Sequence, residues 1–309
     1  MSAEPQLLIV ATDPAPWADA VMSLASPRRR TVVVLPEADI ETSSVEVVVG
    51  APPDLAAIIP RCPQLRWVQS TWAGIDAIAH FASETLQITP VKGVFGPAMT
   101  EYVMGWLLAI ERNVISRASH THWVPTLEPR ITGKRLGIMG TGGIGTAIAL
   151  AAKAFGLEVL GLNSAGRAVE GFTTCHPSAN RLAFAKGLDY LVSVLPQTSQ
   201  TNNLIDHQLF MRLNRGAIVV NAGRGNALVE ADLIASLNAG HLRAAVLDVF
   251  REEPLPPDDP LWSTPGVHIT SHTAGPTPDE AVAEVFEHNL KLYLADEPLP
   301  DAVRAGHGY

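Results

Sequence analysis

A short apolar run in the middle of the chain, Arg135-Leu-Gly-Ile-Met139, leads directly into the glycine-rich loop Gly140-Thr-Gly-Gly-Ile-Gly145. A helical pattern over residues 146–153 follows at once. A glycine loop alone is weak evidence. A strand before it and a helix after it, however, predict the first βα turn of a dinucleotide-binding fold.

Each part of this loop has a predicted use in holding a dinucleotide. Gly140 permits the tight turn, Gly142 lets a pyrophosphate approach backbone N–H groups, and Gly145 lets the helix pack closely on the strand. Gly143 and Ile144 lie between them, and we expect them to belong to the same binding site.

Short apolar runs bounded by turn residues recur on both sides of the loop. They cover residues 7–11, 31–35, 45–50, 65–69, 136–140, 159–162, 190–195, 217–220 and 244–249. Continuous apolarity, without alternation, is typical of parallel strands that are covered on both faces. Helical patterns at residues 147–155, 206–213 and 230–237 lie between the runs, so we predict an α/β protein with doubly wound parallel sheets.

Two longer helical stretches, residues 98–115 and 278–294, interrupt this alternation. Because the glycine loop begins its own βαβ unit in mid-chain, we expect the Rossmann domain, residues 98–274, to be inserted into another domain. That flavodoxin-like substrate-binding domain would comprise residues 1–97, with residues 275–309 returning to it. The long helices would be the crossovers, and the cleft between domains is the default active site.

Composition excludes several classes of protein. The 309 residues carry a net charge of −9 and are 47% hydrophobic and 17% charged, as in ordinary globular domains. No cluster of Lys and Arg follows a helix, and Arg28-Arg29-Arg30 fits a solvated turn, so we expect no nucleic-acid partner. The N-terminus lacks the basic stretch of a signal peptide, and no apolar run approaches the ~20 residues of a membrane helix. Cys62 and Cys175 are isolated, which suits a reducing cytoplasm.

The end of the strand after the glycine loop distinguishes between cofactors. NAD enzymes usually place Asp or Glu there to bind ribose hydroxyls, whereas this chain has Leu162-Asn163-Ser164-Ala-Gly-Arg167. A carboxylate would repel a 2′-phosphate, but an amide, a hydroxyl and a guanidinium can receive one. We therefore predict that Asn163, Ser164 and Arg167 favour NADPH, with NADH as the second candidate. In the alternative, Arg167 points into solvent and Asn163 bonds an unphosphorylated ribose.

Three polar residues of different chemistry each follow an apolar strand in the last third of the chain. Arg224 lies in Val-Asn-Ala-Gly-Arg-Gly, Glu253 in Phe-Arg-Glu-Glu-Pro, and His272 in Thr-Ser-His-Thr-Ala-Gly. Reduction of a 2-oxo acid requires a cation for the substrate carboxylate, an imidazole that delivers a proton, and a carboxylate that keeps the imidazole protonated. Each residue alone has an ordinary structural explanation, but the ordered set after a dinucleotide loop favours catalysis.

Four segments around these residues also carry a family resemblance. They are Leu195-Pro-Gln-Thr-Ser-Gln-Thr201, Gly216-Ala-Ile-Val-Val-Asn-Ala-Gly-Arg-Gly225, Leu247-Asp-Val-Phe-Arg-Glu-Glu-Pro-Leu-Pro256 and Ile269-Thr-Ser-His-Thr-Ala-Gly275. In this order they resemble the signature segments of the D-isomer-specific 2-hydroxyacid dehydrogenases, most closely the glyoxylate/hydroxypyruvate reductases. The resemblance covers essentially the whole chain, including the terminal Gly308-Tyr309.

The resemblance implies roles for individual residues. Arg224 would bind the carboxylate and carbonyl oxygen of the substrate, His272 would be the acid in reduction, and Glu253 would accept a hydrogen bond from the other imidazole nitrogen. Asp248 would hold the nicotinamide end of the cofactor, and Thr100 would lie near the nicotinamide. Further cofactor contacts are expected from Pro196, Thr201, Ala222 and Gly223.

The segment Gln69-Ser-Thr-Trp-Ala-Gly-Ile-Asp76 resembles the family loop whose backbone N–H groups meet the substrate carboxylate. Ala73 and Gly74 would make this contact, since Gly74 allows a close approach. Trp72 would either wall the pocket and limit the size of the substrate side chain, or pack between domains.

His120-Thr-His122-Trp123 contains two histidines but no third ligand nearby, so we predict no metal site. In relatives this region contributes to a dimer contact, and the resemblance therefore implies a homodimer.

The expected activity is the reduction of a small 2-oxo acid to the D-2-hydroxy acid, with hydride from the nicotinamide and a proton from His272. Formate and phosphite dehydrogenases are an alternative, but the formate enzymes have Gln where this chain has Glu253. The other alternative is a dinucleotide-sensing protein without significant turnover, like the transcriptional corepressors of the superfamily. Such adaptors often use long disordered tails, which we do not expect in this chain. The physiological substrate is left open.

Overall fold

The computed structural model describes residues 6–10, 30–34, 42–277 and 279–303. Several expectations fall outside these residues: the turn at Arg28 and Arg29, the strand ends Ala11 and Leu35, the helix start at Pro278, and the terminal Gly308-Tyr309. The chain divides into two compact units, one of Met1–Val94 with Thr277–Tyr309, and one of Phe95–Pro276.

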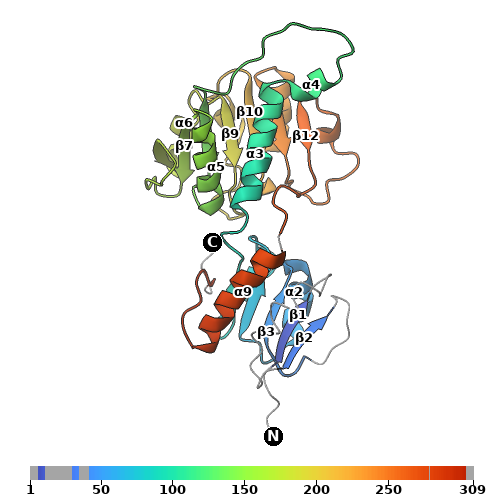
Figure 1. Ribbon diagram of the computed structural model, residues 1–309, viewed down its shortest axis with the longest axis vertical. Helices are drawn as coiled ribbons and strands as arrows, with labels where there is room; N and C mark the ends of the chain where they lie inside the picture. Colours follow the sequence, from blue (N-terminus) through green and yellow to red (C-terminus); the bar gives the residue numbers. More distant parts are fainter. Residues whose placement is uncertain (1–5, 11–29, 35–41, 278, 304–309) are drawn as a thin grey trace. The chain divides into compact units, whose positions relative to one another are not determined.

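The first unit is built on a five-stranded parallel sheet in the order β2-β1-β3-β4-β5 (Figure 1). Its elements are β1 (Gln6–Val10), β2 (Arg30–Val34), β3 (Val45–Gly50), α2 (Pro52–Ile58), β4 (Trp67–Ser70), β5 (Gln87–Thr89) and α9 (Asp279–Leu294). This strand order is that of a flavodoxin-like doubly wound sheet. Helix α9 packs on the sheet through Trp67, whose ring lies 5.3 Å from that of Phe286 and 5.2 Å from that of Tyr293.

The second unit contains a seven-stranded parallel sheet in the order β12-β11-β10-β9-β6-β7-β8. Its strands are β6 (Arg135–Met139), β7 (Glu158–Asn163), β8 (Thr174–Pro177), β9 (Tyr190–Ser193), β10 (Ala217–Asn221), β11 (Leu242–Leu247) and β12 (Val267–Ile269). Its helices are α3 (Gly96–Glu111), α4 (Val114–Ala118), α5 (Gly143–Ala154), α6 (Arg181–Phe184), α7 (His207–Phe210) and α8 (Glu230–Asn238). Strand order reverses at β6, which is the switch point of a Rossmann fold. The predicted α/β class with two doubly wound parallel sheets is confirmed.

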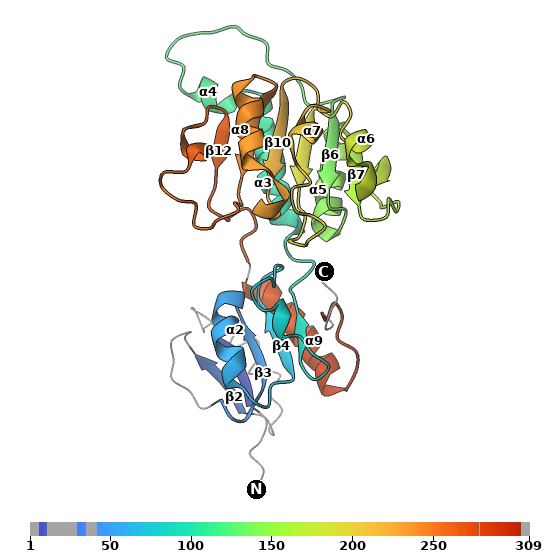
Figure 2. The same ribbon diagram turned by 180° about the vertical axis from the view of Figure 1, so that it is seen from behind.

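Both faces of the second sheet are covered, which accounts for its continuous apolar strands. Ile218 and Val220 point into a core shared with α3 and α5, whereas Val219 points into a core shared with α6, α7 and α8. Figure 1 shows α3 and α5 over one face, and Figure 2 shows α6, α7 and α8 over the other. A strand with a core on each side needs apolar residues at every position.

The prediction for the helix over residues 98–115 was wrong in one respect, because the helix is broken. Helix α3 ends at Glu111, Asn113 adopts a left-handed φ of 51°, and α4 begins at Val114. Asn tolerates this conformation better than most residues. The predicted helix over residues 206–213 is also shorter, since α7 spans only His207–Phe210. Among the described residues, no helix is both long and apolar enough to cross a bilayer.

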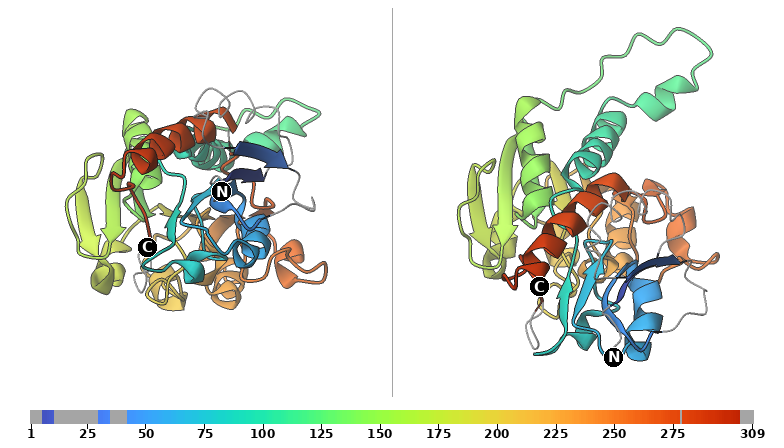
Figure 3. Two further views of the ribbon diagram at one scale, coloured as in Figure 1. Left: turned by 90° about the horizontal axis from the view of Figure 1, so that it is seen from below. Right: turned by 60° about the horizontal axis from the view of Figure 1, so that its bottom comes forward.

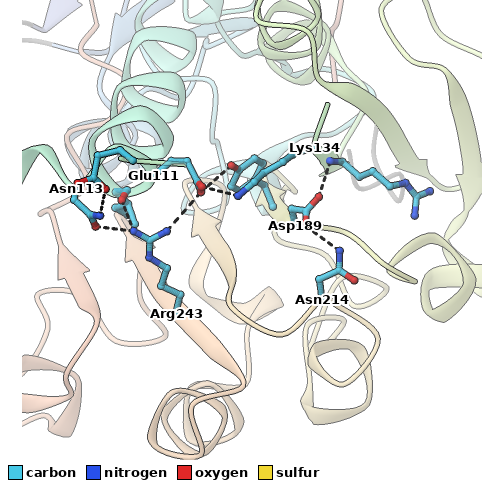
Figure 4. Close-up of polar contacts among 10 residues, drawn as sticks. Glu111, Asn113, Lys134, Asp189, Asn214 and Arg243 are labelled. Atoms are coloured by element: carbon cyan, nitrogen blue, oxygen red, sulfur yellow. Dashed lines mark hydrogen bonds and ion pairs between the residues drawn. The ribbon is translucent and has the colours of Figure 1, made fainter. Parts of the chain in front are cut away.

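A buried carboxylate fixes the end of α3 against the sheet (Figure 4). Glu111 is 1% exposed and accepts hydrogen bonds from Lys134 Nζ at 2.5 Å and from the Tyr190 hydroxyl at 2.9 Å. Arg243 Nη1 lies 3.7 Å from it, while Arg243 Nη2 donates to Asn113 Oδ1 at 2.8 Å. Burial, and the bond to Glu111, raise the pKa of Tyr190 well above its ordinary value. The break after α3 is therefore held by charged and hydrogen-bonded groups.

Candidate active site

The carboxyl edge of the second sheet carries most of the predicted site residues. Gly140 follows β6, Asn163 ends β7, Ala222 follows β10, Asp248 follows β11, and His272 lies shortly after β12. In an open parallel sheet, ligands bind at this edge, outside the strand ends and at the switch point. The described residues of the second unit therefore place these side chains where the fold class puts a ligand.

The glycine loop has the geometry that a bound pyrophosphate needs. Gly140 has a φ of 101°, and a Cβ on Gly145 would lie 1.9 Å from the Gly140 oxygen, so α5 packs directly on the turn. A Cβ on Gly142 or Gly143 would meet nothing within 4 Å, so this side of the loop is open. Because α5 begins at Gly143, its first N–H groups have no partner within the helix and can bind an anion.

Helix α3 and strand β9 each carry a buried hydroxyl that can bind a ligand. Among the described residues, Thr100 Oγ1 in the first turns of α3 and Ser193 Oγ at the end of β9 have no hydrogen-bond partner. A buried hydroxyl without a partner is costly unless a ligand or water satisfies it. The glycine loop and these hydroxyls together fit a dinucleotide cofactor.

The Asn163 side chain folds its own loop. Its Oδ1 accepts from the Arg167 backbone N–H at 3.0 Å, and its Nδ2 donates to the Arg167 oxygen at 2.8 Å and to Thr141 Oγ1 at 3.1 Å. The amide therefore closes the turn over residues 163–167 and ties it to the glycine loop. Ser164 and Arg167 are the exposed polar side chains of this turn.

Arg224 sits between two glycines that allow close packing of the backbone. A Cβ on Gly223 would lie 2.6 Å from the Leu195 backbone, and one on Gly225 would lie 1.9 Å from Phe250. Asn221, buried at the end of β10, donates from Nδ2 to the Arg224 oxygen at 3.2 Å. The guanidinium is half-buried, and its Nη1 donates to the Gly223 oxygen at 2.8 Å. Asn221 was not among the predicted site residues, although a polar residue that ends an apolar strand was a visible signal.

His272 and Glu253 form a hydrogen-bonded pair. His272 Nδ1 lies 2.8 Å from Glu253 Oε2, and the two side chains are 46% and 35% exposed. Glu253 Oε1 accepts from the Phe250 N–H at 2.9 Å, which holds the carboxylate in place. Since the carboxylate engages Nδ1, the imidazole can exchange a proton with a bound molecule through Nε2.

Asp248 is bound to the loop that carries His272. The carboxylate is 2% exposed; its Oδ1 accepts from Thr273 N at 2.9 Å and from Thr270 Oγ1 at 2.5 Å, and its Oδ2 accepts from Ala274 N at 3.0 Å. The Tyr102 hydroxyl lies 2.7 Å from Thr270 Oγ1. Thr270 and Tyr102 were not among the predicted site residues, because their contact joins distant parts of the chain.

The loop after β9 is closed by Thr201. Its hydroxyl donates to the Pro196 oxygen at 2.8 Å and accepts from the Thr198 N–H at 2.9 Å. Thr201 therefore shapes the loop in which Pro196 lies.

The remaining predicted residues, Trp72, Ala73 and Gly74, follow β4 in the first unit. Ser70 Oγ accepts from the Trp72 N–H at 2.9 Å, and the indole is 42% exposed. The start of this loop is anchored by buried Gln69, whose Oε1 accepts from Asn289 Nδ2 at 2.8 Å.

His120 and His122 are exposed, and their rings stack with centroids 6.2 Å apart. Within the described parts of the chain, no group of three or more His, Cys, Asp or Glu side chains could hold a metal ion.

Comparison with known proteins identifies relatives of this chain. The family model described as the NAD-binding domain of D-isomer specific 2-hydroxyacid dehydrogenases matches residues 104–274. Glyoxylate/hydroxypyruvate reductase A of Yersinia enterocolitica is 37% identical over 213 residues, 67% of this chain and 68% of that protein. Its namesake in Serratia proteamaculans is 33% identical over 248 residues, 76% of this chain and 79% of that protein.

Solved structures agree with these sequence matches. A D-isomer specific 2-hydroxyacid dehydrogenase family protein from Aeromonas salmonicida superposes with a TM-score of 0.89 at 33% identity, covering 97% of this chain and 99% of its own. An NADPH-dependent glyoxylate/hydroxypyruvate reductase from Sinorhizobium meliloti, crystallised with NADP and sulfate, gives a TM-score of 0.82 at 28% identity, with 97% and 98% covered.

Proposed function

The chain belongs to the D-isomer specific 2-hydroxyacid dehydrogenase family and is therefore an oxidoreductase; from this premise we propose that it reduces glyoxylate, hydroxypyruvate or a similar small 2-oxo acid to the D-2-hydroxy acid, preferring NADPH. The observation that carries the proposal is the His272–Glu253 pair, 2.8 Å apart, on the sheet edge that also bears Arg224 and the glycine loop. The Yersinia and Sinorhizobium relatives are glyoxylate/hydroxypyruvate reductases by name, which supports the substrate class.

In this proposal His272 is the proton donor. The carboxylate of Glu253 stabilises the imidazolium and fixes the ring through Nδ1, so that Nε2 delivers a proton to the carbonyl oxygen of the substrate. The reduced nicotinamide, when bound, supplies a hydride to the carbonyl carbon. After transfer the imidazole is neutral, and it recovers a proton from solvent through its exposed edge.

Arg224 is proposed to hold the substrate carboxylate and to polarise the carbonyl. A planar guanidinium can donate to two acceptors at once, which fixes the orientation of a 2-oxo acid as a single ammonium would not. The backbone contacts on either side of Arg224 keep it in place. Backbone N–H groups at Ala73 and Gly74 are proposed to meet the same carboxylate, and Trp72 to limit the size of the substrate.

The cofactor is proposed to lie along the carboxyl edge of the second sheet. Gly140, Gly142, Gly143, Ile144 and Gly145 would receive the pyrophosphate, and Ser164 and Arg167 the 2′-phosphate. Asn163 would contribute by holding the turn that presents them. The Sinorhizobium relative was crystallised with NADP, as was a probable 2-hydroxyacid dehydrogenase from Rhizobium etli that is 28% identical to this chain. A D-isomer specific 2-hydroxyacid dehydrogenase from Xanthobacter autotrophicus, 27% identical, was crystallised with NADPH, and these cofactors support the preference. Further contacts are proposed for Thr100, Pro196, Thr201, Ala222, Gly223 and Asp248.

A homodimer is part of the proposal. Four of the ten exposed large hydrophobic side chains in the described residues, Val114, Ile115, Trp123 and Leu127, lie on α4 and the loop after it. This loop extends away from the sheet of its own unit (Figure 3). A concentration of apolar side chains on an extended loop is typical of a protein contact, and a second copy is the proposed occupant. Light scattering should give twice the chain mass, reduced to one chain in a Trp123→Ser, Leu127→Ser variant.

The activity is tested by loss of reduced-nicotinamide absorbance with glyoxylate, hydroxypyruvate, pyruvate and bulkier 2-oxo acids, with NADPH and NADH compared separately. Turnover of the small acids that His272→Ala abolishes and His288→Ala leaves intact supports the proposal. His288 is an exposed histidine on α9 of the first unit and serves as the matched control. Tight NADPH binding without turnover of any acid would instead indicate a dinucleotide-sensing protein.

A further inference from the structure

We infer that Thr270 and Tyr102 are positioning residues, which hold His272 in its reactive orientation through the buried carboxylate of Asp248. These three residues are here called the clamp: Tyr102, Thr270 and Asp248. The inference deepens the proposed function and rests on it, because it assigns His272 the role of proton donor.

The backbone at His272 needs to be held. Its φ of 55° lies in the left-handed region, which is unfavourable for residues other than glycine. Three successive N–H groups are directed at Asp248: that of His272 reaches the Asp248 backbone oxygen at 2.8 Å, and those of Thr273 and Ala274 reach the two carboxylate oxygens at 2.9 and 3.0 Å. Asp248 therefore fixes the backbone at His272 and directly after it.

Thr270 fixes the carboxylate in turn. The Asp248 carboxylate, when ionised, can only accept hydrogen bonds, so the Thr270 hydroxyl donates to its Oδ1 at 2.5 Å. The single hydroxyl proton of Thr270 is then used, and the Tyr102 hydroxyl must donate in the contact of 2.7 Å between them. Burial raises the pKa of Tyr102 to about 12, so it stays a donor at neutral pH. The hydrogen bonds thus run in one direction, from Tyr102 on α3 through Thr270 to Asp248.

Loss of the Thr270 hydroxyl removes a charge-assisted bond from a nearly inaccessible carboxylate and leaves the Tyr102 hydroxyl half-buried without its acceptor. The loop over residues 270–274 then has fewer constraints, and His272 can move away from Glu253. Displacement of a reacting group by about 1 Å can cost on the order of 100-fold in rate. Substrate affinity is proposed to depend on Arg224 and should change little.

The test compares Thr270→Val, which removes only the hydroxyl, with Thr270→Ser, which keeps it. We expect Thr270→Val to lower kcat about 10- to 100-fold with the KM for the 2-oxo acid within about twofold, and Thr270→Ser to recover kcat to within about threefold. Tyr102→Phe should lower kcat less than Thr270→Val. Thr264→Val is the matched control: its buried hydroxyl donates to the Pro260 oxygen at 2.8 Å in the same unit but contacts no clamp residue, so kcat should not change.

A second readout separates this inference from the proposed function. The imidazole signals of His272, assigned by NMR with the His272→Ala variant, report its bond to Glu253 whether or not any acid is reduced. We expect one ordered signal in the wild type and in Thr270→Ser, and a broadened or shifted signal in Thr270→Val. If the wild type reduces no 2-oxo acid but the His272 signal is broadened or shifted in Thr270→Val alone, the proposed function is wrong and the positioning role of the clamp is still supported. Three results would overturn the inference: equal kcat in all three proteins, an equal loss of kcat in Thr270→Val and Thr270→Ser, or an effect confined to a higher KM for NADPH.

Discussion

Glu253 holds His272 from the side opposite to the proposed substrate: its Oε2 lies 2.8 Å from Nδ1, while its Oε1 is bound to the Phe250 N–H. The carboxylate is thus fixed by the backbone before it meets the ring. This arrangement distinguishes two contributions of Glu253, a geometric one through hydrogen bonding and an electrostatic one through its charge.

Glu253→Gln separates these contributions, because the amide keeps a hydrogen-bond acceptor and removes the charge. We expect kcat to fall about 10- to 100-fold, since the imidazolium loses its counter-charge. The neighbouring Glu252, also exposed, is the matched control, and Glu252→Gln should keep kcat within about twofold. Steady-state rates of both variants at neutral pH decide the question; similar kcat values for the two would remove Glu253 from the proposed mechanism.

Arg167 is the one exposed guanidinium on the turn over residues 163–167. If it receives the 2′-phosphate, Arg167→Ala should raise the KM for NADPH about tenfold, the cost of one charge-assisted contact, and leave the KM for NADH unchanged. NADH serves as the internal control because it lacks the phosphate. Parallel changes for both cofactors would show that Arg167 supports the turn and not the phosphate.

The sequence predicted the fold well where burial follows a simple rule. Ile218, Val219 and Val220 are all apolar because the sheet has a core on each face. The loop at the switch point could be recognised in the sequence because its turn requires glycine. Strand β8 was missed because it is only partly buried and its Thr174-Cys-His-Pro177 sequence shows no apolar run. The break at Asn113 was missed because the contact observed there comes from Arg243, on a distant strand.

The same contrast applies to the candidate site. Arg224, Glu253 and His272 could be predicted as candidates because each lies shortly after a strand of the parallel sheet. The partners that hold them could not, since the contact of Tyr102 with Thr270 spans 168 residues and has no local signal. Asn163 was correctly expected at the end of the strand after the glycine loop, but the bonds of its side chain to the backbone of Arg167 depend on the conformation of the loop and were not predicted.

Glu111 should be more important for stability than an ordinary surface carboxylate. In Glu111→Ala, Lys134 and Arg243 lose their carboxylate partner and the Tyr190 hydroxyl loses its acceptor, so we expect the free energy of unfolding to fall by about 3 kcal/mol. Glu158, which pairs with Arg135 at 3.2 Å on the surface, is the matched control, and Glu158→Ala should cost no more than about 0.5 kcal/mol. Urea unfolding measures both; equal losses would contradict a special role for the buried cluster.

The two cysteines should differ in their reaction with iodoacetamide. Burial raises the pKa of the Cys62 thiol to about 11, against a smaller opposite effect of Arg61, and the residue is only 4% exposed. Since the thiolate is the reactive form, native Cys62 should stay unmodified at pH 8 while the half-buried Cys175 is alkylated. Because the pKa of Cys62 is raised in the folded state, folding favours its neutral thiol. The stabilisation from this pKa difference is complete below the ordinary thiol pKa and is lost as the pH rises towards 11. Mass spectrometry of the two cysteine-containing peptides, before and after denaturation in urea, measures how far each cysteine is alkylated. Rapid labelling of native Cys62 at pH 8 would show that β4 and the turn before it open readily.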